Sequence, residues 1–370
     1  MMTRICAGLA LVAGLFPSGG LAEDLPSLPD RLWDVPTLFD DQDDPVLQRL
    51  ALTGLVQYQY AIAEAGEDDV ADGEFRRFRF GGKAQVLGNL YFSGAANFEP
   101  EGGEFYDNLS TSYLAWSPFG NSKKALSRFQ IAAGKMKPRF TREYSTAAKK
   151  IKTFERSLLV NQLAPAKATG ILIGGEVGSL SYVLSLYSGD DTDEFSRFEN
   201  GTLFLGKLGW DIREHLNLGI DYLAGSDDQQ ITAPVDHAVS LSASYNETYE
   251  AGKLALVTDF IVSLTQDDSD AFGIVLLPTY QLGEKWELVG RYQYAASSGD
   301  DGLVLQKRYE RQALFASSPT RGEGYHAGYL GLNYFLHGNQ LKLMTGVEYA
   351  RMSNARFDGW TWFSGLRMDF

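Results

Sequence analysis

The sequence predicts an all-β protein, a transmembrane antiparallel β-barrel of 16 strands with an infolded constriction loop. Three observations support this fold class. Apolar and polar residues alternate along many short runs, the number of runs is even, and short and long connections follow each other in turn. No segment approaches ~18 consecutive apolar residues, which excludes a membrane-spanning helix. A soluble all-β periplasmic protein is the alternative that this composition leaves open.

The N-terminus has the pattern of a secretory signal peptide, which we place at residues 1–22. A basic start is followed by an apolar core and by small residues that end at Ala22. The apolar core is too short to span a bilayer as a helix. Cys6 is the single cysteine and lies inside this segment. Cleavage after Ala22 would therefore leave a mature chain without disulfides, thiol catalysis or thiolate metal sites.

Residues 23–48 form an acidic leader that carries four prolines. The leader lacks alternation, and we interpret it as flexible or loosely docked. The predicted barrel domain occupies residues 49–370. Alternation begins at Leu50, where the sequence LALTGLVQYQY places leucine, valine and tyrosine on one face and glutamine on the other. The same pattern recurs around Val239 and Trp286.

Sixteen such runs predict the strands, an even number that returns both ends of a bacterial barrel to the periplasm. They are 50–62, 74–87, 90–99, 104–117, 127–140, 168–177, 179–188, 200–213, 215–224, 236–248, 251–265, 270–282, 285–297, 323–336, 340–352 and 359–370.

The connections between these runs differ in length by parity. If the first strand rises from the periplasm, every second connection is a periplasmic turn and should be short. Six of these seven turns are tight, and the exception is 118–126. The opposite set contains four longer connections: 141–167, 189–199, 225–235 and 298–322. A soluble sandwich does not explain this parity.

The last strand closes the pattern at the C-terminus. In GWTWFSGLRMDF, an apolar face that includes Trp360 and Trp362 ends on the terminal Phe370, while Arg367 and Asp369 lie on the other face. An apolar face that ends on an aromatic residue is typical of outer-membrane barrels, with Trp and Tyr in the interfacial girdles.

One stretch is strongly basic within this acidic chain. Residues 134–158 hold eight Lys or Arg against two acids, whereas the whole chain has a net charge of −14. Most of it falls in the predicted third external loop, 141–167, which is too long for a simple hairpin connection. Because a barrel of sixteen strands leaves an aqueous channel, we expect this loop to fold inward as a constriction. A solvated basic loop on the surface is the alternative.

A second basic group lies on the predicted second strand, in EFRRFRFGGK. Its phenylalanines would meet lipid, where a charged side chain costs about 2–4 kcal/mol at the bilayer midplane. Arg77, Arg79 and Lys83 are therefore expected to face the interior, and Arg76 is expected on the phenylalanine face near the rim. Salt bridges to interior carboxylates such as Glu287 are the competing explanation.

Taken together, RRFRFGGKAQVLGNLYFSGAANF, GKMKPRFTREYSTAAKKIKTFERSL and TGILIGGEVGSLSYVLSLYSGD resemble the phosphate-selective porin O/P family. Weaker similarity runs from Leu50 to Phe370 and includes KRYER at 307–311. The resemblance implies a sixteen-stranded trimeric porin with a channel lined by basic residues. The chain departs from the family in its short acidic leader and in an arginine missing near 203–212.

These observations predict an outer-membrane porin, a passive diffusion channel for small hydrophilic solutes that prefers anions such as phosphate. A general or cation-tolerant porin, and a closed structural barrel, are the alternatives. An enzyme is disfavoured, because none of the four histidines stands at a suggestive spacing from a serine and an acid. We expect no catalytic residues, cofactor or metal. The expected partners are small anions, outer-membrane lipid and, from the resemblance, two further copies in a homotrimer; no nucleic acid is expected.

The pore-lining prediction names six residues: Lys149, Lys150, Lys152, Arg77, Arg79 and Lys83. The lysines are expected to face the strand cations across the constriction. On a helical turn Lys149 and Lys152 share a face and should point into the channel, with Lys150 at the loop surface. Phe154 and Leu158, four residues apart, should fix the loop to the inner wall. Glu155 and Arg156 should anchor its end by pairing with wall residues.

Overall fold

The computed structural model describes residues 33, 35–66, 68–119, 129–190, 193–250, 252–265, 269–305, 308–314, 320–353 and 357–370. The predicted signal peptide, residues 1–22 with Cys6, lies outside the described residues. The chain divides into two compact units, Met1–Val35 and Pro36–Phe370, and the second unit holds the barrel. No helix among the described residues is long and apolar enough to cross a bilayer.

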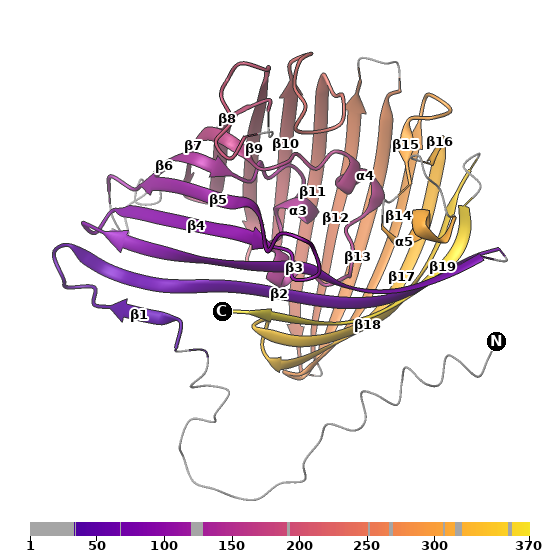
Figure 1. Cartoon of the computed structure of the whole chain (residues 1–370), viewed down its shortest axis with the longest axis horizontal. Coiled ribbons are helices and arrows are strands. Elements are labelled where there is room, and N and C mark those ends of the chain that lie inside the picture. The colour runs from indigo at the N-terminus through magenta and orange to yellow at the C-terminus, as the bar shows by residue number, and fades with distance from the viewer. Residues whose placement is uncertain are drawn as a thin grey trace, which may run out of the picture. The chain divides into compact units, whose positions relative to one another are not determined.

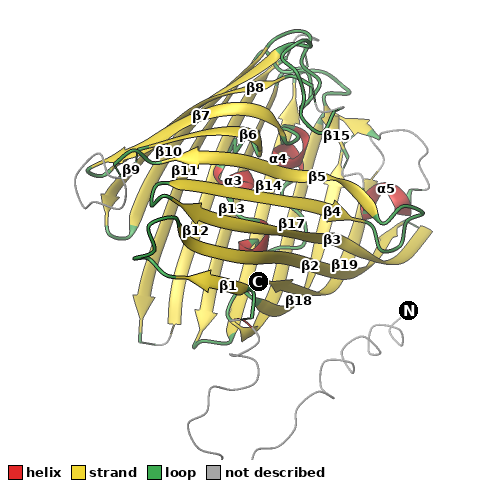
Figure 2. Cartoon of the chain, turned by 60° about the vertical axis from the view of Figure 1, so that its left-hand side comes forward, coloured by secondary structure: helices red, strands yellow, loops and turns green. Residues whose placement is uncertain are grey.

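Within the described residues, sixteen antiparallel strands pair with their neighbours in chain order and close into a barrel when β19 pairs with β2 (Figures 1 and 2). This confirms the predicted fold class. The strands are β2 (Leu47–Ala65), β3 (Asp68–Val86), β4 (Leu90–Phe98), β5 (Tyr106–Trp116), β6 (Gln130–Met136), β7 (Ala168–Val177), β8 (Leu180–Ser188), β9 (Thr202–Arg213), β10 (Leu216–Gly225), β11 (His237–Tyr249), β12 (Gly252–Leu264), β13 (Ala271–Leu282), β14 (Trp286–Ser297), β17 (Gly324–His337), β18 (Leu341–Met352) and β19 (Phe357–Asp369).

Strand lengths depart from the prediction at three places. Strands β2 and β3 each run 19 residues and are joined by a turn in which Gly66 has φ 69°. They are longer than predicted because the acidic residues that looked like a loop pair across this hairpin. Strand β6 has only 7 residues. It ends just before Pro138, which has no N–H for the ladder.

A short strand that the pattern did not predict lies inside the leader. Strand β1 (Thr37–Asp40) pairs with the first part of β2, and Thr37 stands opposite Ala51. The terminal Phe370 exchanges backbone hydrogen bonds with Gly54 a few residues further along the same edge. The part of β2 that β19 leaves unpaired is therefore covered, which removes an exposed strand edge.

The two faces of the wall differ in chemistry. Along β14 the side chains of Trp286 and Leu288 are exposed, whereas the intervening Glu287 is only 4% exposed. Phe260 and Asp259 show the same contrast on β12. Because the lipid side of a barrel must be apolar, the exposed residues form the outer face and the polar ones point inward.

The connections follow the predicted parity at one end of the barrel. Tight turns there include Gly88, Gly178, Gly283 and Gly338, all with positive φ. The other end carries longer segments between β6 and β7, β8 and β9, β10 and β11, and β14 and β17, and also the tight β2–β3 turn. Two of the long segments contain helices: α3 (Arg142–Ser145), η1 (Ala148–Lys150) and α4 (Leu158–Gln162) in one, and α5 (Tyr309–Ala313) in the other. The latter segment also carries the short pair β15 (Leu303–Val304) and β16 (Arg321–Gly322).

Candidate pore-lining site

The segment 137–167, which we call the basic loop, lies against inward-facing side chains of many strands. At its start, the backbone N–H groups of Arg142 and Glu143 donate to the carboxylate of Asp259 on β12, at 3.0 and 2.8 Å. The Arg142 guanidinium donates to Ser242 and Ser244 on β11. These contacts tie the loop to the wall opposite the strand from which it departs.

Strand β6 carries a glycine, Gly134, close to the point where the loop departs. Gly134 has φ 131°, and a Cβ at this position would lie 2.3 Å from the carbonyl oxygen of Ser112 on β5. A side chain at Gly134 would therefore force strands β5 and β6 apart. This contact gives a structural reason for the glycine that opens the basic stretch.

Apolar residues hold the middle of the loop against the wall. Phe154 is 3% exposed, and its ring stacks on Phe363 of β19 with centroids 5.1 Å apart. Leu158 is 1% exposed, and its backbone N–H donates to the Gln293 side chain of β14 at 2.7 Å. Both residues were expected to fix the loop to the wall, and the structure buries both.

Two of the predicted loop lysines form ion pairs with wall carboxylates. Lys149 Nζ lies 2.8 Å from Asp369 Oδ2 on β19. Lys152 pairs with Glu287 on β14 and donates to Thr279 on β13 at 2.9 Å. Each lysine therefore compensates an acid that would otherwise stand in the interior. Both were expected to point into the channel, and in the structure each ties the loop to a carboxylate of the wall.

Lys150 is exposed and has no ion pair with any described residue. It lies on η1 next to Ala148, whose carbonyl oxygen accepts from Gln57 Nε2 at 3.1 Å. Gln57 Oε1 in turn accepts from Arg77 at 2.6 Å. The structure thus brings η1 and Arg77 to the same glutamine.

A β-bulge overturns the expected direction of Arg76. Gln57 stands opposite Arg77 and the next residue, Tyr58, stands opposite Phe75, so Arg76 is the extra residue of β3. A bulge re-aims the side chain that it carries. Arg76 therefore turns inward and its Nε lies 2.9 Å from Glu155 Oε1, instead of lying on the phenylalanine face.

Glu155 and Arg156 differ in their roles. Burial alone raises the pKa of Glu155, but the charges of Arg76 and Arg77 and the hydrogen bonds from Arg76 and Gln59 lower this pKa to about 2. Glu155 thus pairs with the wall as expected. Arg156 donates within the loop, to the backbone oxygens of Glu143 and Thr146.

The remaining predicted cations of β3 have neutral partners. Arg79 donates to Asn97 Oδ1 on β4 at 2.8 Å, as Arg77 does to Gln57. Lys83 is exposed and stands in register with Ser93. Within the described residues, no carboxylate lies within ion-pair distance of any of these three side chains.

Two lysines that the prediction did not select lie close to these arginines. Lys137 and Lys167 stand at the two ends of the basic loop. The Lys137 ammonium lies 3.5 Å from the centre of the Tyr144 ring, and Lys167 donates to Ser110 on β5. Among the described residues neither lysine has a carboxylate partner. We call Arg77, Arg79, Lys137 and Lys167 the cation cluster.

Burial and repulsion between positive charges lower the pKa values of the two lysines of the cation cluster. Burial, together with the charges of Arg156, Arg139, Arg77 and Lys167, lowers the pKa of Lys137 to about 5. Burial, together with the charges of Arg79, Arg77 and Lys135, lowers the pKa of Lys167 to about 6. An anion among these groups would relieve both the repulsion and the cost of burial.

The prediction missed these two lysines because it followed local charge density. Lys137 lies in the basic stretch, but the denser group at 149–152 attracted the assignment. Lys167 lies nine residues beyond the stretch, immediately before β7. Position relative to the strands would have been a usable signal for these two lysines. A residue next to a strand end is held by the wall, whereas a residue in the middle of a loop can reach an acidic partner.

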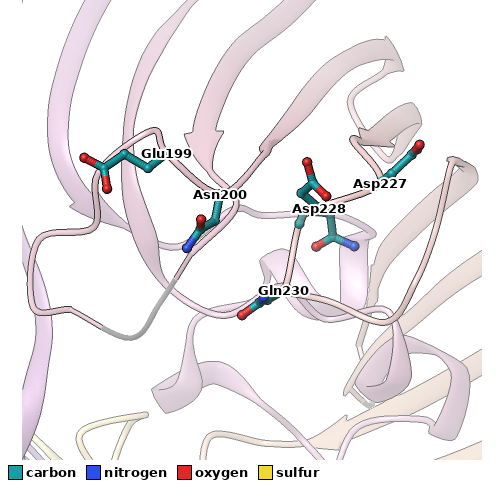
Figure 3. Close-up of a pocket in the computed structure, with 6 residues that line it drawn as sticks. Glu199, Asn200, Asp227, Asp228 and Gln230 are labelled. Carbon is teal, nitrogen blue, oxygen red and sulfur yellow. The ribbon is translucent and has the colours of Figure 1, made fainter.

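The acidic residues concentrate elsewhere. A pocket of 530 Å³ lies between the β8–β9 and β10–β11 connections and is lined by Glu199, Asn200, Asp227, Asp228, Gln229 and Gln230 (Figure 3). Its lining includes no basic residue. Lys207 lies on β9, in the range 203–212 where an arginine was expected, and pairs with Asp221 at 2.6 Å. Part of the negative charge of the chain thus lies in a connection, away from the cation cluster.

The family model for phosphate-selective porin O and P matches residues 51–255, more than half of the chain. The chain belongs to this family. The protein is an outer-membrane porin, a channel rather than an enzyme. Comparison with curated proteins gives no match.

Solved porin structures resemble the barrel of this porin. An anion-selective porin from Comamonas acidovorans is 14% identical, with a TM-score of 0.60, and the match covers 87% of this chain and 99% of that one. A loop-deletion mutant of OmpT, an outer membrane protein of Vibrio cholerae, is 13% identical, with a TM-score of 0.58 and the same coverage. At these identities the likeness shows the fold alone.

Proposed function

We propose that this porin is an anion-preferring diffusion channel and that the cation cluster sets the preference. One observation carries the proposal: among the described residues, four buried or half-buried cations converge without a carboxylate in ion-pair distance. Charges in a confined, low-dielectric passage lower the barrier for counter-ions and raise their local concentration. The family name and the anion-selective Comamonas porin support the same direction.

The cluster suits a small oxyanion such as phosphate. Arginine offers planar paired donors that match an oxyanion, and lysine offers a compact charge that releases it readily. Lys83 and Lys150 are exposed and have no ion pair among the described residues, so they would add to the positive field. Lys149 and Lys152 would act on the solute indirectly, by keeping Asp369 and Glu287 compensated.

A cation-tolerant channel is the second candidate, and a specific observation favours it. Asp211 points inward on β9 and accepts only from the neutral Asn217, at 2.7 Å. The chain as a whole is also acidic, with net charge −14. Cations would then concentrate at the two ends of the channel. The selectivity would depend on whether the charges at the constriction or those at the channel ends have the larger effect.

The test is the reversal potential of purified protein in a planar bilayer under a KCl gradient. We expect an anion-preferring wild type, with chloride current reduced by added phosphate. A cation-preferring wild type would contradict the proposal. The variant Arg77→Gln/Arg79→Gln should lose the preference, while Lys253→Gln, on β12, serves as a matched control outside the cluster.

We further propose a homotrimer in the outer membrane, exported by a cleaved signal peptide and oriented with the basic loop on the external side. Vibrio cholerae OmpT has been solved in a trimer form, which supports the oligomeric state by fold analogy. The exposed apolar outer face would contact lipid and neighbouring copies. Cross-linking in membranes and N-terminal sequencing of the exported protein would test these points.

A further inference from the structure

A second connection reaches the interior of the barrel. The segment 298–323 joins β14 to β17 and carries α5. Tyr309, Glu310 and Ala313 of α5 are 3%, 6% and 0% exposed. Tyr325 of β17 donates to Glu310 at 2.7 Å, which holds the helix against the wall. A helix buried to this degree belongs to the interior structure and not to a surface loop.

Side chains at the start of α5 share partners with Phe154 and Glu155 of the basic loop. The Tyr309 hydroxyl donates to Glu74 on β3 at 2.5 Å and accepts from Gln59 on β2 at 2.8 Å. Gln59 also donates to Glu155 of the basic loop at 3.2 Å. The Tyr309 ring meets Phe363 edge-on with centroids 5.7 Å apart, and Phe363 is the ring on which Phe154 stacks.

Four charges of alternating sign complete this junction. Arg308 pairs with Glu74, and its Nε lies 4.0 Å from Glu155 Oε1. Glu155 pairs in turn with Arg76. Two arginines and two glutamates carry no net charge, so the junction adds little to the field of the passage. Its groups hold two loops together, in contrast to the uncompensated cation cluster nearby.

We infer that α5 positions the part of the basic loop around Phe154 and Glu155, with Arg308 and Tyr309 as the positioning residues. The inference rests on the proposed function, because it assigns to α5 the task of holding the constriction at one width. The basic loop is tied to the wall on its other sides by Asp259, Asp369 and Glu287. At Glu155 the loop also contacts the wall residues Arg76 and Arg291. Arg308 adds a contact there from a second connection, and this contact is the one that α5 supplies.

The test compares variants that break the junction with opposite changes in charge. Arg308→Gln removes a positive charge, and Glu74→Gln removes a negative one. Tyr309→Phe removes two hydrogen bonds and keeps the ring. If α5 positions the loop, all three variants should raise the open-channel noise of single channels in the same direction, by about threefold. The double variant Glu74→Gln/Arg308→Gln should add little to either single change, because both remove the same interaction.

A pure charge effect would give a different result, and it would overturn the inference. In that case Arg308→Gln and Glu74→Gln would shift the reversal potential in opposite directions and leave the noise unchanged. Arg321→Gln is the matched control, since this exposed arginine lies in the same connection and, among the described residues, its side chain donates to the backbone of Asp301. Heat-dependent gel mobility verifies that each variant forms a barrel. A wild type without anion preference would refute the proposed function, but the noise comparison would still decide the role of α5.

Discussion

Two regions of the barrel interior hold similar numbers of basic side chains and use them in opposite ways. Near the wall from β13 to β19, Lys149 pairs with Asp369, Lys152 with Glu287, and Arg291 with Glu143 and Glu348, while Lys342 and Arg367 donate to backbone oxygens of the basic loop. Near β3, the cation cluster has only amides, hydroxyls and backbone oxygens as partners among the described residues. The first region fixes the basic loop, and the second is the one that we propose acts on the solute.

This contrast shows that charge density along the chain is a poor guide to the field in a pore. The densest lysine group, at 149–152, is largely neutralised by the wall. The sparser basic residues near β3 have no carboxylate within ion-pair distance among the described residues. Pairing across the barrel decides which basic residues anchor the loop and which stand without an acidic partner among the described residues.

The largest expected effect tests the paired region. The Arg291 side chain is 1% exposed and bonds Glu348 at 2.5 Å and Glu143 at 3.4 Å. Arg291→Met would leave two buried carboxylates without their cation, so we expect the free energy of unfolding to fall by about 3–5 kcal/mol. Urea unfolding in detergent micelles, followed by gel mobility, measures the loss. Arg351→Met, which breaks the exposed Arg351–Asp358 pair, should cost far less; equal losses would contradict the contrast.

The second effect tests the cation cluster through selectivity. Arg77→Glu/Arg79→Glu should lower the anion-to-cation permeability ratio by about tenfold or more, because the field of a confined charge acts directly on ion concentration. Reversal potentials under a KCl gradient give the ratio. Conductance should remain measurable, which separates a change of selectivity from a collapsed barrel. An unchanged permeability ratio would show that the residues that set the selectivity do not lie on β3.

The third effect is a dependence on pH. With pKa values lowered to about 5 and about 6, Lys137 and Lys167 are largely neutral at neutral pH and gain positive charge as the pH falls through those values. The anion preference should therefore rise, by about threefold between about pH 8 and about pH 4.5. Lys137→Met/Lys167→Met should flatten this profile. Lys83→Met, which changes an exposed lysine on the same side, should leave its slope intact.

The smallest expected effect tests the paired region through its contribution to selectivity. Lys152→Met/Glu287→Met removes both members of a pair and leaves the net charge unchanged. We expect the reversal potential to stay where it is in the wild type, since the pair contributes little net field. Lys152→Met alone should shift the potential toward cations, because it leaves Glu287 uncompensated. A shift in the double variant as large as in the single one would show that Lys152 acts on the solute directly.

Local pattern in the sequence determined the barrel. Alternation along each strand, an even strand count and the tight turns at one end follow from a wall that meets lipid on one face and water on the other. The inward direction of Arg77 and Arg79 follows from the same period. Burial of Phe154 and Leu158 was also predictable, because apolar residues four apart share a face even in a short helical segment.

Tertiary structure alone decided how the charges pair. Arg76 turns inward because a single extra residue in β3 shifts its side chain relative to Gln57, and period-2 counting cannot show a bulge. Lys149 and Asp369 are 220 residues apart, and Lys152 and Glu287 are 135 apart. Tyr309 reaches Glu74 across 235 residues. An ion pair depends on which side chains the closed barrel brings within about 4 Å, and this distance is set by strand register and loop path rather than by neighbours in the chain.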